Sequence, residues 1–140
     1  MATVRARTFR YGVTLDREWT AASDRGGAPL ANEEATWTPE HLLLTALARC
    51  VLTSLGHHAG RAGVAVASSA EAAGTVTRRD EDGRFAFIEI EVDAAVDLEP
   101  AQPAAAARDL VARAERDCFV AASLAVTPAY RWTVDGAPLG

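Results

Sequence analysis

The stretch that decides the fold is residues 38–50, "TPEHLLLTALARC". Thr38 can cap a helix, Pro39 suits the first turn, and Glu40 places a negative charge near the positive end of the helix dipole. The apolar residues that follow predict a helix that runs to about Ala59, because Gly60 and Gly63 come soon after that residue. This stretch therefore predicts a long apolar helix at the centre of the fold.

The predicted helix is apolar on more than one side. Its large apolar residues are Leu42, Leu43, Leu44, Leu47, Val51, Leu52 and Leu55. A sheet covers only one side of such a helix, and an uncovered apolar surface of this kind marks an interaction site. We therefore expect a homodimer, in which a second copy of the chain covers the rest.

Composition limits the classes of function. The 140 residues fit one domain, 1–140, and the net charge is −5. All 14 basic residues are arginines without a long basic run, so we expect no nucleic-acid partner. The N-terminus lacks the apolar core of a secretory signal, and the most apolar stretch is too short to span a bilayer. We expect a cytoplasmic protein without a membrane partner.

Strand patterns lie on both sides of the predicted helix. Residues 3–20 alternate apolar and polar side chains around Tyr11-Gly12, which predicts a hairpin, and the segment 21–37 is predicted to be an exposed connection. Residues 64–96 form two strand-like runs joined by a charged turn that contains Asp82-Gly83. The chain ends with a predicted strand in residues 125–134, where Pro128 suits an edge or the start of the strand.

A second helix is predicted after Pro103. Residues that share one face of this helix are apolar: Ala107, Leu110, Val111, Ala114 and Cys118. Helices flanked by hairpins are typical of an α+β fold rather than of a parallel doubly wound sheet. The sequence thus predicts antiparallel sheets with two helices.

Cys50 and Cys118 are the first candidates for chemistry. A free cysteine on an apolar helix is usually inert packing, because burial disfavours the reactive thiolate. Here each cysteine lies on a helix, or at its end, with an apolar face toward the same sheet, so the two thiols could approach within disulfide reach. Such a pair could act as a peroxidatic and a resolving cysteine.

A reactive thiolate needs a positive neighbour, and arginine stays charged when it is desolvated. Arg49 is adjacent to Cys50 in the sequence but points about 100° away on a helix, so Arg10, Arg17 and Arg25 are better candidates. A carboxylate should orient that arginine, and Glu40 is the candidate. Ten residues of helix place Glu40 about 15 Å from Cys50, so it would act through an extended arginine or across a dimer interface.

Metal and nucleotide chemistry find no support in the sequence. The histidines His41, His57 and His58 form no His-x-x-x-His motif, and the cysteines form no Cys-x-x-Cys motif. No Gly-rich phosphate loop and no Gly-x-Ser-x-Gly motif is present. We therefore expect neither a metal nor a cofactor.

The segments "TPEHLLLTALARC" and "AERDCFVAASL" resemble the OsmC/Ohr family, the osmotically inducible protein C and organic hydroperoxide resistance proteins. The resemblance spans nearly the whole chain and implies an intertwined dimer that reduces organic hydroperoxides with cysteine thiols. It implies that Cys50, Cys118 and Glu40 are site residues and that Arg10, in an Arg-x-Gly turn, is the essential arginine, with Arg17 in reserve. Phe119 follows Cys118 where the peroxidases of the family usually have proline.

The resemblance also implies a reaction cycle. Arg10 holds the Cys50 thiolate and Glu40 orients Arg10. Cys50 attacks the hydroperoxide and becomes a sulfenic acid, which Cys118 converts to a disulfide. A dithiol such as a lipoylated protein then restores both thiols. Two alternatives remain open at this point: a non-catalytic dimer that binds a small apolar ligand, and a redox sensor.

Overall fold

The computed structural model describes residues 6–18, 20–31 and 36–140. The chain divides into two compact units, Met1–Glu40 and His41–Gly140. The expectation of a single domain over residues 1–140 stays a prediction. No helix in the described ranges is long and apolar enough to cross a membrane.

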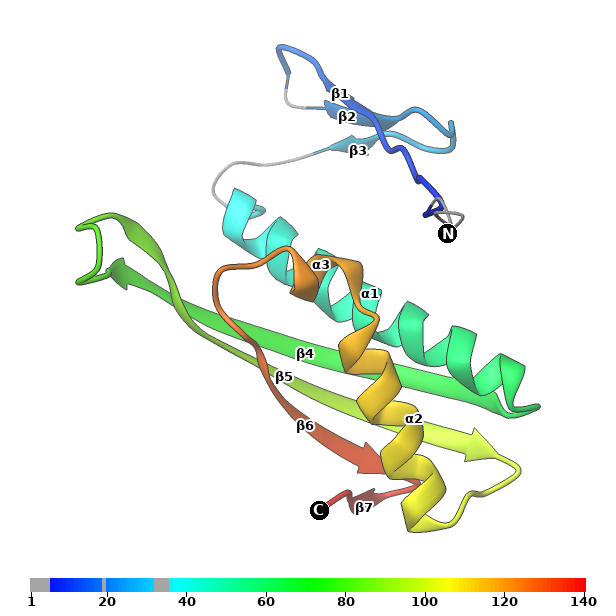
Figure 1. Ribbon diagram of the computed structural model, residues 1–140. Coiled ribbons are helices and arrows are strands. Elements are labelled where there is room, and N and C mark those ends of the chain that lie inside the picture. The colour runs from blue at the N-terminus through cyan, green and yellow to red at the C-terminus, as the bar shows by residue number, and fades with distance from the viewer. Residues whose placement is uncertain (1–5, 19, 32–35) are drawn as a thin grey trace, which may run out of the picture. The chain divides into compact units, whose positions relative to one another are not determined.

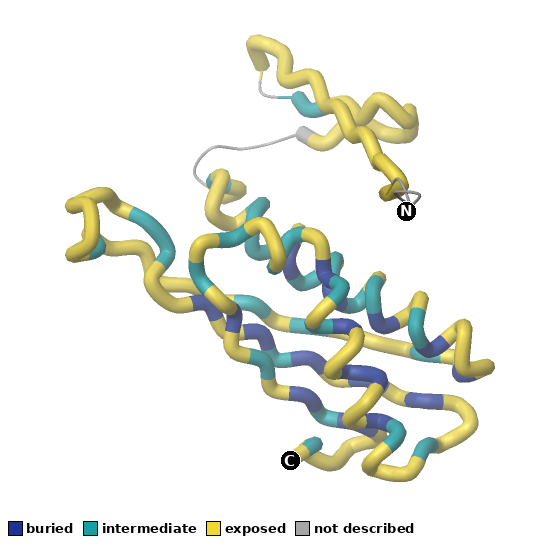
Figure 2. Tube along the Cα trace, in the orientation of Figure 1, coloured by how far each residue is buried: buried dark blue, intermediate teal, exposed yellow. Residues whose placement is uncertain are grey.

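The first unit holds a small antiparallel sheet in the order β1-β2-β3. Its strands are β1 (Val13–Leu15), β2 (Thr20–Ser23) and β3 (Leu30–Ala31). Most of the side chains described in this unit are exposed (Figure 2).

The hairpin predicted around Tyr11-Gly12 is wrong in its position. Both residues precede β1, and the turn between β1 and β2 is built by Asp16, whose carboxylate accepts hydrogen bonds from the backbone N–H groups of Glu18 and Thr20 at 2.9 and 3.0 Å. An aspartate whose side chain binds the backbone two residues on favours a turn without any glycine. Residues 3–5 of the predicted hairpin lie outside the described residues, as does Trp19.

The segment predicted as a connection, 21–37, is also partly wrong. It contains most of β2 and all of β3, which pair in an antiparallel register. The prediction failed because strands of four and two residues are too short to give a periodic pattern. Residues 32–35 of this segment lie outside the described residues.

The second unit is a four-stranded sheet, ordered β4-β5-β6-β7, with helices on one face (Figure 1). Its strands are β4 (Ala65–Arg78), β5 (Phe85–Glu99), β6 (Ala129–Val134) and β7 (Ala137–Pro138). The helices are α1 (Pro39–Arg61), which begins before the unit boundary, α2 (Ala104–Arg116) and α3 (Phe119–Ala122). The predicted first helix, the long hairpin turn near Gly83 and the last strand are confirmed.

Two details of the predicted architecture are corrected. The part of the chain that the structure describes has a third helix, α3, of only four residues. Strand β6 pairs with β5 in parallel, because α2 and α3 carry the chain back across the sheet before β6 begins. The other paired strands are antiparallel.

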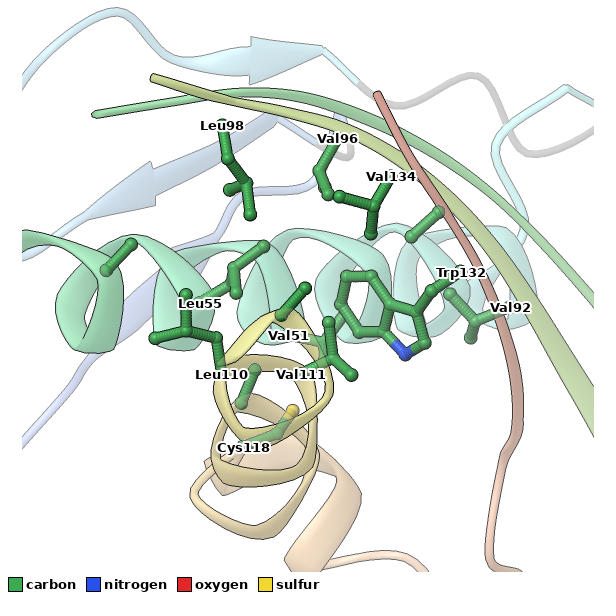
Figure 3. Close-up of a cluster of buried hydrophobic side chains, with 14 of the residues drawn as sticks. Val51, Leu55, Val92, Val96, Leu98, Leu110, Val111, Cys118, Trp132 and Val134 are labelled. Atoms are coloured by element: carbon green, nitrogen blue, oxygen red, sulfur yellow. The ribbon is translucent and has the colours of Figure 1, made fainter. Parts of the chain in front are cut away.

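The core lies between the helices and the sheet of the second unit (Figures 2 and 3). Strand β5 supplies it with alternate residues: Ile90, Val92, Ala94, Val96 and Leu98 are buried, while the residues between them face outward. The helices supply Leu47, Val51, Leu55, Leu110 and Val111, and β6 supplies Trp132 and Val134. Burial of these side chains fixes the helices against the sheet and so positions both cysteines.

Candidate redox site at the thiol pair

Cys50 lies in the middle of α1, on the side that faces the core. Leu47 and Val51 beside it are fully buried, whereas Cys50 itself is only partly buried and packs against the edge of the core cluster. The thiol of Cys50 is therefore held by a rigid helix and remains within reach of small molecules.

Cys118 lies in the turn that joins α2 to α3. The sequence pattern placed it on the apolar face of the second helix, but that helix ends at Arg116 and Cys118 is the residue before α3. Its carbonyl accepts a hydrogen bond from the backbone N–H of Ala122 at 3.0 Å. The side chain is 0% exposed and lies in the core cluster beside α2 (Figure 3).

The two cysteines meet in the core. Both are free thiols, and they lie close enough for Cys50 to raise the pKa of the Cys118 thiol. Burial raises the pKa of the Cys118 thiol, and the neighbouring Cys50 raises it further, while the N–H groups of Ala121 and Val120 lower it. Cys118 is thus a neutral thiol near neutral pH, held next to a thiol that is more accessible than itself.

Phe119 does not turn Cys118 away from Cys50. It opens α3 with its own side chain 56% exposed, while the preceding Cys118 points into the core. A proline at this place is therefore not needed for contact between the two cysteines.

An ion pair fixes the turn that carries Cys118. His58 Nε2, in the last turn of α1, lies 2.7 Å from Oδ2 of Asp117, and the guanidinium of Arg116 donates to both oxygens of the same carboxylate. These hydrogen bonds, that from Arg116 first, lower the pKa of Asp117. Cys50 and His58 both belong to α1. The hydrogen bond between His58 and Asp117 therefore links the helix that carries the first thiol to the turn that carries the second.

Strand β6 adds a phenol to this neighbourhood. The Tyr130 ring stacks on Trp132, with ring centroids 6.3 Å apart, and its hydroxyl oxygen is buried without a hydrogen-bond partner among the described residues. The indole N–H of Trp132 faces the Glu115 carboxylate without reaching full hydrogen-bond geometry. Burial raises the pKa of Glu115, and the interaction with Trp132 lowers it. The sequence analysis missed Tyr130, although its alternation with Trp132 and Val134 marks the inner face of the strand.

The remaining predicted site residues belong to the first unit. Arg10 is exposed, Arg17 lies in the turn between β1 and β2, and Glu40 opens α1. Cys50 belongs to the second unit, so the roles of these three residues beside it stay predictions.

Several hollows adjoin the sheet, and two of them lie near residues of this site. One of about 840 Å³ lies over β4, β5 and β6 and is lined by Glu71, Asp93, Arg131 and Tyr130 among others, but by neither cysteine. A smaller one of about 340 Å³ is lined by Glu115, Pro128 and Tyr130, next to the turn that carries Cys118. In the described part of the chain, no three histidine, cysteine or carboxylate side chains are grouped closely enough to hold a metal ion.

A known protein family and several solved structures match this chain. The family model described as OsmC-like protein matches residues 32–132. The chain belongs to the OsmC-like protein family. No curated protein matches it closely enough to be counted as a relative.

Solved structures share the fold of this OsmC-like protein. An OsmC-like protein of unknown function from Vibrio cholerae is 15% identical with a TM-score of 0.73, and the match covers 89% of this chain and 99% of the other. The organic hydroperoxide resistance protein OhrB of Bacillus subtilis is 23% identical with a TM-score of 0.58, over 91% and 98%. An organic hydroperoxide resistance protein from Elizabethkingia anophelis is 17% identical with a TM-score of 0.61, over 94% and 100%.

Proposed function

We propose that this OsmC-like protein is a thiol-dependent peroxidase that reduces organic hydroperoxides through Cys50 and Cys118 and so defends against oxidative stress. The observation that carries the proposal is the contact between a partly exposed and a fully buried thiol. The names of two structural relatives, organic hydroperoxide resistance proteins, support the choice of substrate class.

Exposure assigns the roles of the two thiols. A hydroperoxide must touch the sulfur that it oxidises, and Cys50 is the accessible one of the pair. Its thiolate attacks the terminal oxygen of the hydroperoxide, the O–O bond breaks, and the alkoxide that leaves takes a proton from water and becomes an alcohol. Cys50 becomes a sulfenic acid, and the oxidant is reduced by two electrons.

Cys118 resolves this sulfenic acid. Its sulfur displaces the hydroxyl group from Cys50, a disulfide forms, and one water molecule is released. Burial suits this role, because a neutral and inaccessible thiol does not compete for the hydroperoxide. A dithiol, such as that of a lipoylated protein, then reduces the disulfide by thiol exchange.

The first unit supplies the charge in this proposal. Arg10 stabilises the Cys50 thiolate and polarises the hydroperoxide, Glu40 orients Arg10, and Arg17 is the reserve candidate. A second copy of the chain completes the site as a homodimer. Leu42, Leu43, Leu44 and Leu52 of α1, each only partly buried, form the apolar surface that such a dimer covers. Light scattering at micromolar concentration should give twice the mass of the chain.

Stopped-flow measurement of thiol loss tests the proposal. Reduced protein is mixed with cumene hydroperoxide and, separately, with hydrogen peroxide; the apolar surroundings of Cys50 predict a faster reaction with the organic substrate. The Cys50→Ser variant should consume neither, and Thr53→Ser, an exposed position on the same helix, should react as the wild type does. Equal, slow thiol loss in wild type and Cys50→Ser would favour a non-catalytic dimer with packed cysteines.

A further inference from the structure

The two sulfurs of a Cys50–Cys118 disulfide would not be equivalent toward a reductant. Cys118 is 0% exposed, whereas Cys50 is partly exposed, so an incoming thiolate reaches the sulfur of Cys50. Attack there breaks the S–S bond and expels Cys118 as the thiolate. The leaving group of the reduction step is therefore the buried sulfur.

A buried thiolate is a poor leaving group. Burial raises the pKa of the Cys118 thiol to about 11, and exchange becomes slower as the pKa of the leaving thiol rises. The N–H groups of Ala121 and Val120 favour the charged form but do not offset burial. A further hydrogen-bond donor to the sulfur of Cys118 would therefore speed its departure.

Most donors near this turn are already engaged. His58 and Arg116 are both bound to the Asp117 carboxylate, and the indole N–H of Trp132 faces Glu115. The Tyr130 hydroxyl, like the indole N–H of Trp132, is buried without a hydrogen-bond partner among the described residues. Unlike the indole, it does not act on the Glu115 carboxyl by hydrogen bonding. Burial raises the pKa of this hydroxyl most, and among the neighbouring groups an ionised Cys118 raises it most strongly, followed by Glu115 and Cys50.

The Tyr130 side chain also suits a donor in its position and its chemistry. Its strand is fixed by pairing with Val92 of β5, and its ring by stacking on Trp132. Burial raises the pKa of the hydroxyl to about 12, so the group keeps its proton throughout the physiological range. It is a neutral, buried donor whose pKa responds to the charge on Cys118.

We propose that the Tyr130 hydroxyl donates a hydrogen bond to the sulfur of Cys118 while that sulfur leaves during reduction by a dithiol. The proposal rests on the disulfide cycle of the proposed function. One thiolate of the dithiol forms an S–S bond with Cys50, the Cys50–Cys118 bond breaks, and the electron pair goes to Cys118, which then takes a proton. The second thiol of the dithiol, as thiolate, next displaces Cys50, so the reductant leaves as a cyclic disulfide.

Reduction kinetics of protein oxidised with diamide test this role without using a peroxide. Wild type and Tyr130→Phe, each carrying the Cys50–Cys118 disulfide, are mixed with excess dithiothreitol and quenched with an alkylating reagent, and the free thiols are counted by mass spectrometry. Loss of a hydrogen bond to a charged group should slow the reduction of Tyr130→Phe by at least about tenfold. Thr133→Val, which removes a hydroxyl from the opposite face of β6, should be reduced at the wild-type rate.

A second readout follows the charge on Cys118 itself. In a Cys50→Ser background, Tyr130→Phe should move the pH profile of Cys118 alkylation upward by about one unit, since the thiolate loses a donor. Should Tyr130→Phe not fold, incorporation of 3-fluorotyrosine, a stronger donor, should instead speed the reduction of the disulfide.

Equal reduction rates within twofold for wild type and Tyr130→Phe would overturn the proposal, as would failure of diamide to join Cys50 to Cys118. A different result would reject the proposed peroxidase function alone. If hydroperoxide leaves the wild-type thiols intact while the disulfide made with diamide shows the tenfold difference, the peroxidase proposal fails and the role of Tyr130 stands.

Discussion

The surroundings of the two cysteines differ although both belong to one core. Cys50 lies on a long helix at the edge of the cluster and stays accessible, whereas Cys118 lies in a short turn and is fully buried. Side-chain hydrogen bonds fix the residue before Cys118, whereas Cys50 is held by its helix and by packing against the core cluster. The difference teaches that burial, rather than residue type, assigns which thiol meets an oxidant and which one resolves it.

The largest effect is expected from removal of the buried thiol. Cys118→Ser should lose all turnover with a dithiol reductant but still react once with cumene hydroperoxide at the wild-type rate. Without a resolving thiol, excess oxidant should drive Cys50 on to the sulfinic acid, which mass spectrometry detects as two added oxygens. A Cys118→Ser protein that turns over normally would show that the buried thiol has no part in the cycle.

The next effect tests why Cys50 reacts. Arg10→Met should reduce the fraction of Cys50 present as thiolate and slow the reaction with hydroperoxide about 10- to 100-fold, because an opposite charge nearby favours the ionised form. The pH dependence of Cys50 alkylation measures this fraction directly. Arg17→Met is the matched comparison: if it slows the reaction and Arg10→Met does not, the essential arginine is Arg17.

A smaller effect is expected at the ion pair that precedes Cys118. Asp117→Asn removes the charge that His58 and Arg116 share, so the turn should hold Cys118 less firmly and disulfide formation should slow several-fold while sulfenic acid forms at the normal rate. Rapid-quench trapping of the sulfenic acid separates the two steps. Asp109→Asn, which breaks an exposed pair with Arg113 on α2, serves as the control and should change neither.

The smallest effect concerns stability at alkaline pH. The pKa of Cys118 rises on folding from its ordinary value of 9.0 to about 11, so the stability that the protonated thiol contributes is complete below pH 9 and is lost as pH rises toward 11. Denaturant unfolding of the reduced protein across this range should show a falling free energy of unfolding. In Cys118→Ala the fall should be shallower; an unchanged slope would mean that the thiol titrates alike in the folded and unfolded chain.

The sequence predicted those elements whose boundaries depend on local signals. Thr38 and Pro39 mark the start of α1, and the alternation around Ile90 and Val92 marks β5; both match the structure. The parallel pairing of β6 with β5 could not be predicted from such signals, because the residue pattern of a strand does not show which strand it pairs with. The turn at Asp16 was missed because one side-chain carboxylate, rather than a glycine, closes it.

The site was predictable in its residues more than in its geometry. Two apolar faces directed at one sheet predicted that Cys50 and Cys118 could approach each other, and the two side chains are near each other in the structure. Their difference in exposure depends on where α2 ends, which periodicity fixes only to within a few residues. Tyr130 carries no motif at all, and its electrostatic link to the thiols depends on its packing against the core cluster.

The most direct test of the account is peptide mapping by mass spectrometry after reduced wild-type protein meets one equivalent of cumene hydroperoxide. The account predicts a loss of two hydrogens from the chain and a single crosslinked peptide that joins Cys50 to Cys118. The account would be contradicted if the wild-type protein kept both thiols and the Cys118→Ser variant were oxidised no faster than an ordinary exposed cysteine.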